Sequence, residues 1–278
     1  MDKRNSEALL SLLNDPDKDT FKAVAGSLSL DAEIIPVLEC LWRQADDEPA
    51  ISRLDWLIHR ARLNKLAKRL MEWRGKIAEI LEGAWLVATY QYPDLPFAEA
   101  DEAIDGIARD VWLELRDDMT PLEQVETINR VLFGKYGIQG DTGSIISINN
   151  VLINNVLRTR KGNHLGLAIL YISLAQKLDI PIFGVPLLRA FALAYLNDDD
   201  LLFYIDPFSG GRIFDETEAR RFLKEQQIPF DREYIRPCSD EVTIQMLIAE
   251  MMLLYSGKGM KSKAKDMEEL LRKLMKEG

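Results

Sequence analysis

The sequence of 278 residues predicts a predominantly helical α+β fold, with a few short strands and helical additions at both ends. Three observations support this prediction. Apolar residues recur at helical spacing through the first third of the chain. A long apolar helix over Gly162–Leu178 is followed by short runs that are typical of strands. Two further apolar stretches, joined by a glycine-containing turn, end the chain.

Residues 1–78 are expected to form a helical N-terminal region. Asp31 is well placed as an N-cap, because its carboxylate can accept hydrogen bonds from the first turn of a helix. Pro36 falls within the early turns of the same helix, where proline is least disruptive. Gly75 and Gly83 are expected to bend or interrupt the last of these helices. The helices expected here, the last of which runs on into the core, are Ser6–Asn14, Thr20–Leu28, Asp31–Ala45 and the long segment Ser52–Thr89.

Residues 79–236 are expected to form the core. Thr120, Pro121 and Glu123 predict a helix start, because threonine caps, proline suits the first position and glutamate completes a capping box. Asn150 and Asn154 lie four residues apart, which places both on one face of a predicted helix. The helix over 162–178 is apolar nearly all round and is therefore expected to be buried. The core helices expected are Ala98–Glu114, 120–133, Ser147–Leu157, Gly162–Leu178 and Thr217–Gln226.

The sheet is expected from three strands that follow the buried helix, at Phe183–Val185, Ala190–Leu196 and Leu202–Ile205. Turns are expected at Asn197–Asp200 and Ser209–Gly211. Residues 237–278 form the third predicted region. Its helices, Ser239–Tyr255 and Lys261–Lys276, are expected to pack as a hairpin.

Composition excludes several classes of function. The formal net charge of −10 argues against a general nucleic-acid binder, which needs clustered cations. No apolar run reaches the length that a membrane-spanning helix needs, and the first ten residues lack the apolar stretch of a signal peptide. Two cysteines, Cys40 and Cys238, are too few for a disulfide framework. We therefore expect a cytoplasmic protein with neither nucleic acid nor membrane as a partner.

Five phrases give the core a family resemblance: LEGAWLVATYQYPDL, LFGKYGIQG, NVLINNVLRTRKGN, LAILYISLAQKLDIPIFGV and LLFYIDPFSGG. Their order and spacing over about Leu81 to Leu223 resemble the SirB1-type transglutaminase-like family. The resemblance implies a helix-rich α+β domain of papain-like descent with a small antiparallel sheet. The N-terminal helices resemble a HEAT-type unit, and the C-terminal pair resembles a single TPR-like unit.

The wider superfamily uses a cysteine at a helix N-terminus, a histidine on a neighbouring strand and an aspartate that orients the histidine. The resemblance places these three positions at His164, Ala190 and Asp206. Members of the SirB1 type commonly carry proline at the first position and histidine at the second. This chain therefore resembles a degenerate core in which neither the nucleophile nor the base is kept.

Each candidate residue has two interpretations. His164 is either a substitute base or ligand beside Asp206, or a neutral, hydrogen-bonded and inert histidine in the first turn of a buried helix. Asp206 is either a surviving orienting group or the cap of a turn. Asn150 and Asn154 either line a groove or bond to backbone. The two histidines and two cysteines are too scattered to predict a metal site, and the sequence predicts no cofactor.

Three functions remain open from the sequence. The first is a catalytically inactive protein that binds a protein or peptide partner or acts as a scaffold. The second is a divergent hydrolase or amide-transfer enzyme that uses His164 and Asp206 with another nucleophile. The third is binding of a small ligand in the vestigial cleft. The residues expected to line that cleft are Asn150, Asn154, Asn163, Tyr171 and Phe191.

Overall fold

The computed structural model of the chain describes residues 13, 15, 17–28, 30–75, 79–143, 147–187, 190–198 and 200–275. The chain forms two compact units, Met1–Glu72 and Trp73–Gly278. The helix predicted over Ser6–Asn14 lies outside the described residues except for Leu13. The division into regions 1–78, 79–236 and 237–278 stays a prediction.

The first unit is helical. It contains α2 (Lys18–Ser27), η1 (Ala32–Ile34), α3 (Ile35–Gln44) and most of α4 (Glu48–Arg74). Asp31 caps η1 as predicted, because its side chain accepts a hydrogen bond from the Glu33 amide. The apolar faces of these helices form one cluster, whose buried members are Leu13, Leu38, Leu41, Ala50, Leu54, Leu57 and Ile58.

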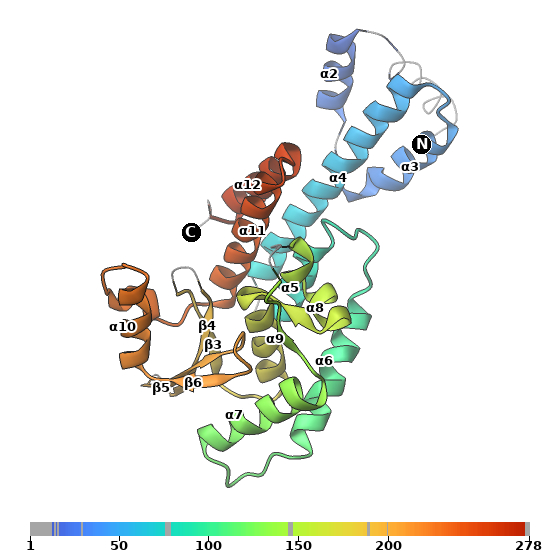
Figure 1. Cartoon of the computed structure of the whole chain (residues 1–278). Helices are drawn as coiled ribbons and strands as arrows, with labels where there is room; N and C mark the ends of the chain where they lie inside the picture. The colour runs from blue at the N-terminus through green and yellow to red at the C-terminus, as the bar shows by residue number, and fades with distance from the viewer. Residues whose placement is uncertain are drawn as a thin grey trace. The chain divides into compact units, whose positions relative to one another are not determined.

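The second unit is built around α9 (His164–Lys177), which lies among the other helices of the unit and its sheet (Figure 1). Every residue of α9 from Leu165 to Ala175 is buried. The helix is apolar on all sides because α5, α6, α8 and the sheet all pack against it. The other helices that precede the sheet are α5 (Ile80–Ala88), α6 (Phe97–Trp112), α7 (Pro121–Asn129), the π-helical η2 (Arg130–Lys135), η3 (Ile148–Asn150) and α8 (Ile153–Thr159).

The sheet is antiparallel with strand order β3-β4-β5-β6. Three strands agree with the predicted runs: β3 (Ile182–Val185), β4 (Ala192–Asn197) and β5 (Asp200–Asp206). The fourth strand, β6 (Arg212–Phe214), was not predicted. It pairs Arg212 with Asp206 after a turn in which Gly210 and Gly211 have φ of 70° and 80°, a region that glycine enters without strain. A separate parallel pair joins β1 (Gln139–Gly140) to β2 (Lys161–Gly162).

One face of the sheet packs against α9, and its other apolar side chains pack with α10 (Glu216–Glu225) and η4 (Arg232–Ile235). The chain ends in α11 (Asp240–Gly257) and α12 (Lys261–Met275), which pack against each other as the predicted hairpin. α11 also contacts α5 and β3, so the hairpin is part of the second unit. Lys276, the predicted last residue of the second helix, lies outside the described residues.

The helix predicted over Ser147–Leu157 is wrong as a single element. η3 and α8 are separate, because Leu152 has an extended backbone with φ −79° and ψ 126°. Gly166 of α9 explains the break, since a Cβ there would lie 2.6 Å from the carbonyl oxygen of Asn150. That carbonyl accepts a hydrogen bond of 2.8 Å from the Asn163 amide. Asn150 and Asn154 therefore do not share one helix face.

The segment predicted over Ser52–Thr89 is likewise divided, with α4 ending at Arg74 and α5 beginning at Ile80. Gly83 lies inside α5 and does not interrupt it. The predicted fold class, a mainly helical α+β domain with a small antiparallel sheet, is confirmed. None of the helices within the described residues is long and apolar enough to span a bilayer.

Candidate functional site

Three hydrogen bonds of Asn163 fix the N-terminus of α9. Asn163 caps it, because its Oδ1 accepts a bond of 2.8 Å from the Gly166 amide. The Asn163 backbone amide donates to Asn150 of η3. Its Nδ2 donates to Oε1 of Glu250 on α11. This arrangement fixes the first residue of the helix, His164.

The imidazole of His164 is half-buried and stacks on Phe208, with ring centroids 4.0 Å apart and an interplanar angle of 17°. Burial lowers the pKa of His164, and the nearby negative charge of Asp206 opposes this in part. The ring is therefore neutral at pH 7. No residue in the described part of the chain forms a hydrogen bond with it. The interpretation of His164 as a neutral histidine in the first turn fits this geometry, but the hydrogen bond expected for its ring is replaced by stacking on Phe208.

Asp206 ends β5 and caps the turn that follows. Its Oδ1 accepts hydrogen bonds from the amides of Phe208 (3.0 Å) and Ser209 (3.3 Å). Its carbonyl oxygen accepts a bond of 2.9 Å from the Gly211 amide. Among the residues that the structure describes, none donates a hydrogen bond to Oδ2. Oδ1 of Asp206 thus stabilises the turn, and Oδ2 can accept a hydrogen bond from a ligand.

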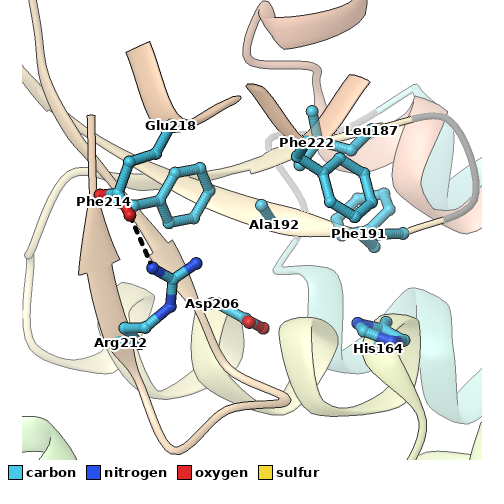
Figure 2. Close-up of a pocket in the computed structure, with 10 residues that line it drawn as sticks. His164, Leu187, Phe191, Ala192, Asp206, Arg212, Phe214, Glu218 and Phe222 are labelled. Carbon is cyan, nitrogen blue, oxygen red and sulfur yellow. Dashed lines mark hydrogen bonds and ion pairs between the residues drawn. The ribbon is translucent and has the colours of Figure 1, made fainter. Parts of the chain in front are cut away.

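His164, Ala190 and Asp206 line one cavity of about 80 Å³. The three segments that meet there are the start of α9, the residues just before β4 and the end of β5. Figure 2 shows the carboxylate of Asp206 directed toward the side of the cavity that His164 occupies. The full set of described lining residues is His164, Leu187, Ala190, Phe191, Ala192, Asp206, Arg212, Phe214, Glu218 and Phe222.

Arg212 and Glu218 form an ion pair of 2.9 Å at the rim of the cavity (Figure 2). Their side chains are 54% and 40% exposed, so the pair adds little to stability. The Arg212 guanidinium also lies 5.4 Å from the ring centroid of Phe214. Sequence reasoning missed these residues because β6 is too short to show an alternating pattern. The glycine turn at 209–211 was the one signal that a strand could return there.

Of the five residues predicted to line the cleft, Phe191 lines this cavity and the other four lie elsewhere. Asn150 donates through Nδ2 to Asp141, and Asn163 is the helix cap described above. Tyr171 is completely buried, and its hydroxyl donates a bond of 3.0 Å to Oδ1 of Asn129. Burial raises the pKa of Tyr171 well above its usual value. Oδ1 of Asn154 is buried without a hydrogen-bond partner among the described residues.

The chemistry available in the cavity is narrow. The described lining residues include an imidazole, two carboxylates and a guanidinium, with neither a thiol nor a hydroxyl among them. Covalent catalysis needs a nucleophile within hydrogen-bond reach of a base. At the positions that the resemblance assigns to nucleophile and base, residue 164 is an imidazole and residue 190 supplies only a methyl group. None of the described lining residues therefore supplies the thiol or hydroxyl that covalent acyl transfer needs.

Comparisons with known proteins agree with the α+β fold described above. The profile of the Transglutaminase-like superfamily matches residues 98–249. The chain is 28% identical to a UPF0162 protein of Xylella fastidiosa over 185 residues, 64% of this chain and 65% of that protein. It is 27% identical to a UPF0162 protein of Pseudomonas aeruginosa over 183 residues, 65% of this chain and 66% of that protein.

A UPF0162 protein of Vibrio cholerae is 24% identical over 139 residues, 50% of this chain and 52% of that protein. The chain covers just under two thirds of the length of the Xylella and Pseudomonas relatives. No solved structure matches it. Because the superfamily profile matches more than half of the chain, the chain belongs to the transglutaminase-like superfamily.

Proposed function

We propose that this chain is a catalytically inactive transglutaminase-like protein of the SirB1 type that binds a protein or peptide partner. The proposal includes its HEAT-like and TPR-like helical additions and a cytoplasmic location. The observation that supports it is the cavity at the N-terminus of α9, which is lined by His164, Ala190 and Asp206, the three positions that the resemblance assigns to the triad.

Neither cysteine can replace the missing nucleophile in this cavity. Cys40 is exposed on α3, in the other compact unit. Cys238 pairs through its backbone amide with Gly184, and its sulfur lies 3.5 Å from the hydroxyl of Thr243. Burial raises the pKa of the Cys238 thiol, which lowers the fraction of reactive thiolate. A thiol mechanism therefore has no support at the cavity.

The size of the cavity favours one inserted side chain over a free small molecule. A volume of about 80 Å³ corresponds to roughly five to eight water-sized spheres. Dedicated small-molecule sites are commonly several times larger, on the order of 300 Å³ or more. Anchor side chains of protein partners commonly bind in well-packed, desolvated pockets.

The catalytic half of the proposal is tested with the purified protein under reducing conditions. Fluorogenic peptide amides and amine incorporation into casein should show no turnover above buffer. The variant His164→Cys with Ala190→His should give at most weak activity and a modest fall in thiol pKa, measured by alkylation at different pH values. Wild-type turnover that disappears in Cys40→Ala with Cys238→Ala would refute inactivity. Turnover that survives there but is lost in His164→Gln would instead support the divergent hydrolase.

The binding half is tested by nuclear magnetic resonance titration with a panel of capped tripeptides that differ in the central residue. We expect at least one peptide to perturb methyl resonances of Leu187 and Ala192. Ala190→Leu should abolish the perturbation by filling the cavity. Ala98→Leu, the same substitution at an exposed position of α6, should not change it. A panel that produces no perturbation at the cavity would contradict the proposed binding.

A further inference from the structure

We infer that the guest of this cavity is a cationic side chain of a peptide, with its charged head at Asp206 and its apolar stem against the phenylalanines. The inference rests on the proposed function and specifies its ligand. Guanidinium and ammonium groups share the required chemistry, and the structure favours guanidinium.

The charges of the described lining residues leave one negative charge unbalanced. Arg212 and Glu218 neutralise each other across 2.9 Å. His164 is neutral at pH 7, because burial lowers its pKa. Asp206 remains, and no cation among the described residues pairs with it. A guest carboxylate would meet this charge at close range, whereas a cation would complete the cavity.

The geometry of Asp206 leaves one acceptor for this contact. The turn amides of Phe208 and Ser209 occupy Oδ1, and Oδ2 has no donor among the described residues. The carboxylate is directed along the cavity toward His164, and the apolar residues Ala192 and Phe191 lie beside this path (Figure 2). A donor that enters the cavity can therefore reach Oδ2 without disrupting the turn.

Aromatic walls favour a delocalised cation. Phe191 and Phe222 line the cavity beside Phe214, whose ring already stacks on Tyr204 and lies under Arg212. Phenylalanine rings attract cations through their faces. Guanidinium is more weakly hydrated than ammonium and stacks on rings, so it loses less on entering such a site. The same region of the chain contains two arginine–phenylalanine contacts of this kind. Arg212 lies over Phe214, and Arg220 lies 3.8 Å from the centroid of Phe230.

The test uses the full chain and acetylated, amidated tripeptides with glycine on both sides of one variable residue. The central residues are arginine, its neutral isostere citrulline, lysine, acetyl-lysine and glutamate. Titration calorimetry should rank arginine first and lysine second. Citrulline should bind on the order of tenfold more weakly than arginine, because a hydrogen bond between charged partners is stronger than one with a neutral donor. The glutamate peptide should not bind measurably.

Asp206→Asn is the decisive variant, because an asparagine Oδ1 can still accept the two turn amides while the charge is removed. We expect it to bring the arginine and citrulline affinities within about twofold of each other. Asp231→Asn is the matched control. Asp231 also caps a turn, by accepting from the Glu233 amide at 3.0 Å, but does not line the cavity. This control should keep the wild-type preference.

If Asp206→Asn does not fold, Glu218→Gln replaces it. That change leaves the Arg212 charge unpaired at the rim, so it should also weaken arginine binding relative to citrulline. Equal binding of arginine and citrulline to the wild-type protein would overturn the charge inference and leave peptide binding intact. Absence of binding by all five peptides would count against the proposed function as well.

Discussion

Gly166→Ala tests the close packing that positions the site. A Cβ at residue 166 would lie 2.6 Å from the carbonyl oxygen of Asn150 and 3.1 Å from Cα of Val151. Both are backbone atoms, so neither can rotate away as a side chain could. The η3 turn must therefore move, and with it the hydrogen bond between the Asn163 amide and Asn150. The substitution should loosen the segment that holds His164.

The expected change in the free energy of unfolding is the sum of opposing effects. Alanine is favoured over glycine inside a helix by about 1 kcal/mol. Overpacking against a rigid neighbour costs about 1–3 kcal/mol, and loss of the backbone hydrogen bond costs about 0.5–1.5 kcal/mol. The net effect is a loss of about 0.5–3.5 kcal/mol in the free energy of unfolding. Gly166→Ala should therefore destabilise the protein although alanine is the better helix former.

Gly106→Ala is the matched control. Gly106 lies inside α6, and a Cβ there would meet no atom within 4 Å. The same substitution should here stabilise by about 0.5–1 kcal/mol. Both residues belong to the second unit, so urea unfolding can compare them in the same transition. A Gly166→Ala protein that is at least as stable as Gly106→Ala would refute the packing argument.

Three further predictions concern charge and the C-terminal hairpin. Burial raises the pKa of Glu250, so the folded state holds this proton more tightly than the unfolded state, and wild-type stability should fall as pH rises from about 4.5 through the raised folded value. Glu250→Gln cannot titrate, so its melting temperature should rise relative to that of the wild type as pH increases from about 4.5 through the raised pKa of Glu250; a constant difference would contradict this. Truncation after Pro237 removes the buried apolar residues of α11, each of which stabilises the fold by about 1.5–3 kcal/mol. The truncated protein should therefore be less soluble or have a lower melting temperature. A truncated protein with unchanged solubility and melting temperature would disprove the packing role. The buried apolar residues of α11 are Ile244, Leu247, Ile248, Met251 and Tyr255. Burial lowers the pKa of His164 from its ordinary value of 6.5, so affinity for the arginine tripeptide should fall as pH drops through this lowered pKa. His164 then gains a positive charge in a cavity that it shares with Asp206, Arg212 and Glu218. His164→Gln should flatten this profile, and a profile that persists in the variant would exclude His164 as its cause.

Local sequence signals predicted the elements whose causes are local. The capping box at Thr120 is present as expected, with the Thr120 amide donating to Glu123 at 2.7 Å. The apolar run of α9 indicated a helix buried on all sides, and Asn163 before it supplies the cap. Three strands could be read from their alternation and their turns. These features depend on neighbours within a few residues of each other.

Long-range contacts explain what the sequence did not show. The break between η3 and α8 exists because Gly166 lies against Asn150, and no local pattern marks that approach. The contact between Asn163 and Glu250 joins residues 87 positions apart. β6 exists because Arg212 pairs with Asp206, although three residues alone carry no period. The cavity was therefore found from the resemblance of the chain to a family, and its rim was found only from the structure.

The residues that fix the N-terminus of α9, here called the frame of the site, differ from the three positions that the resemblance assigns to the triad. Asn163, Gly166 and Glu250 hold the start of α9, and none of them is a triad position. No described residue forms a hydrogen bond with the His164 ring, and the side chain of Ala190 is a methyl group, so neither side chain fixes this frame by hydrogen bonding within the described part of the chain. Asp206 differs because its Oδ1 caps the turn before β6. An aspartate at this position therefore has a structural role without a histidine to orient, and its second oxygen remains available to bind a guest.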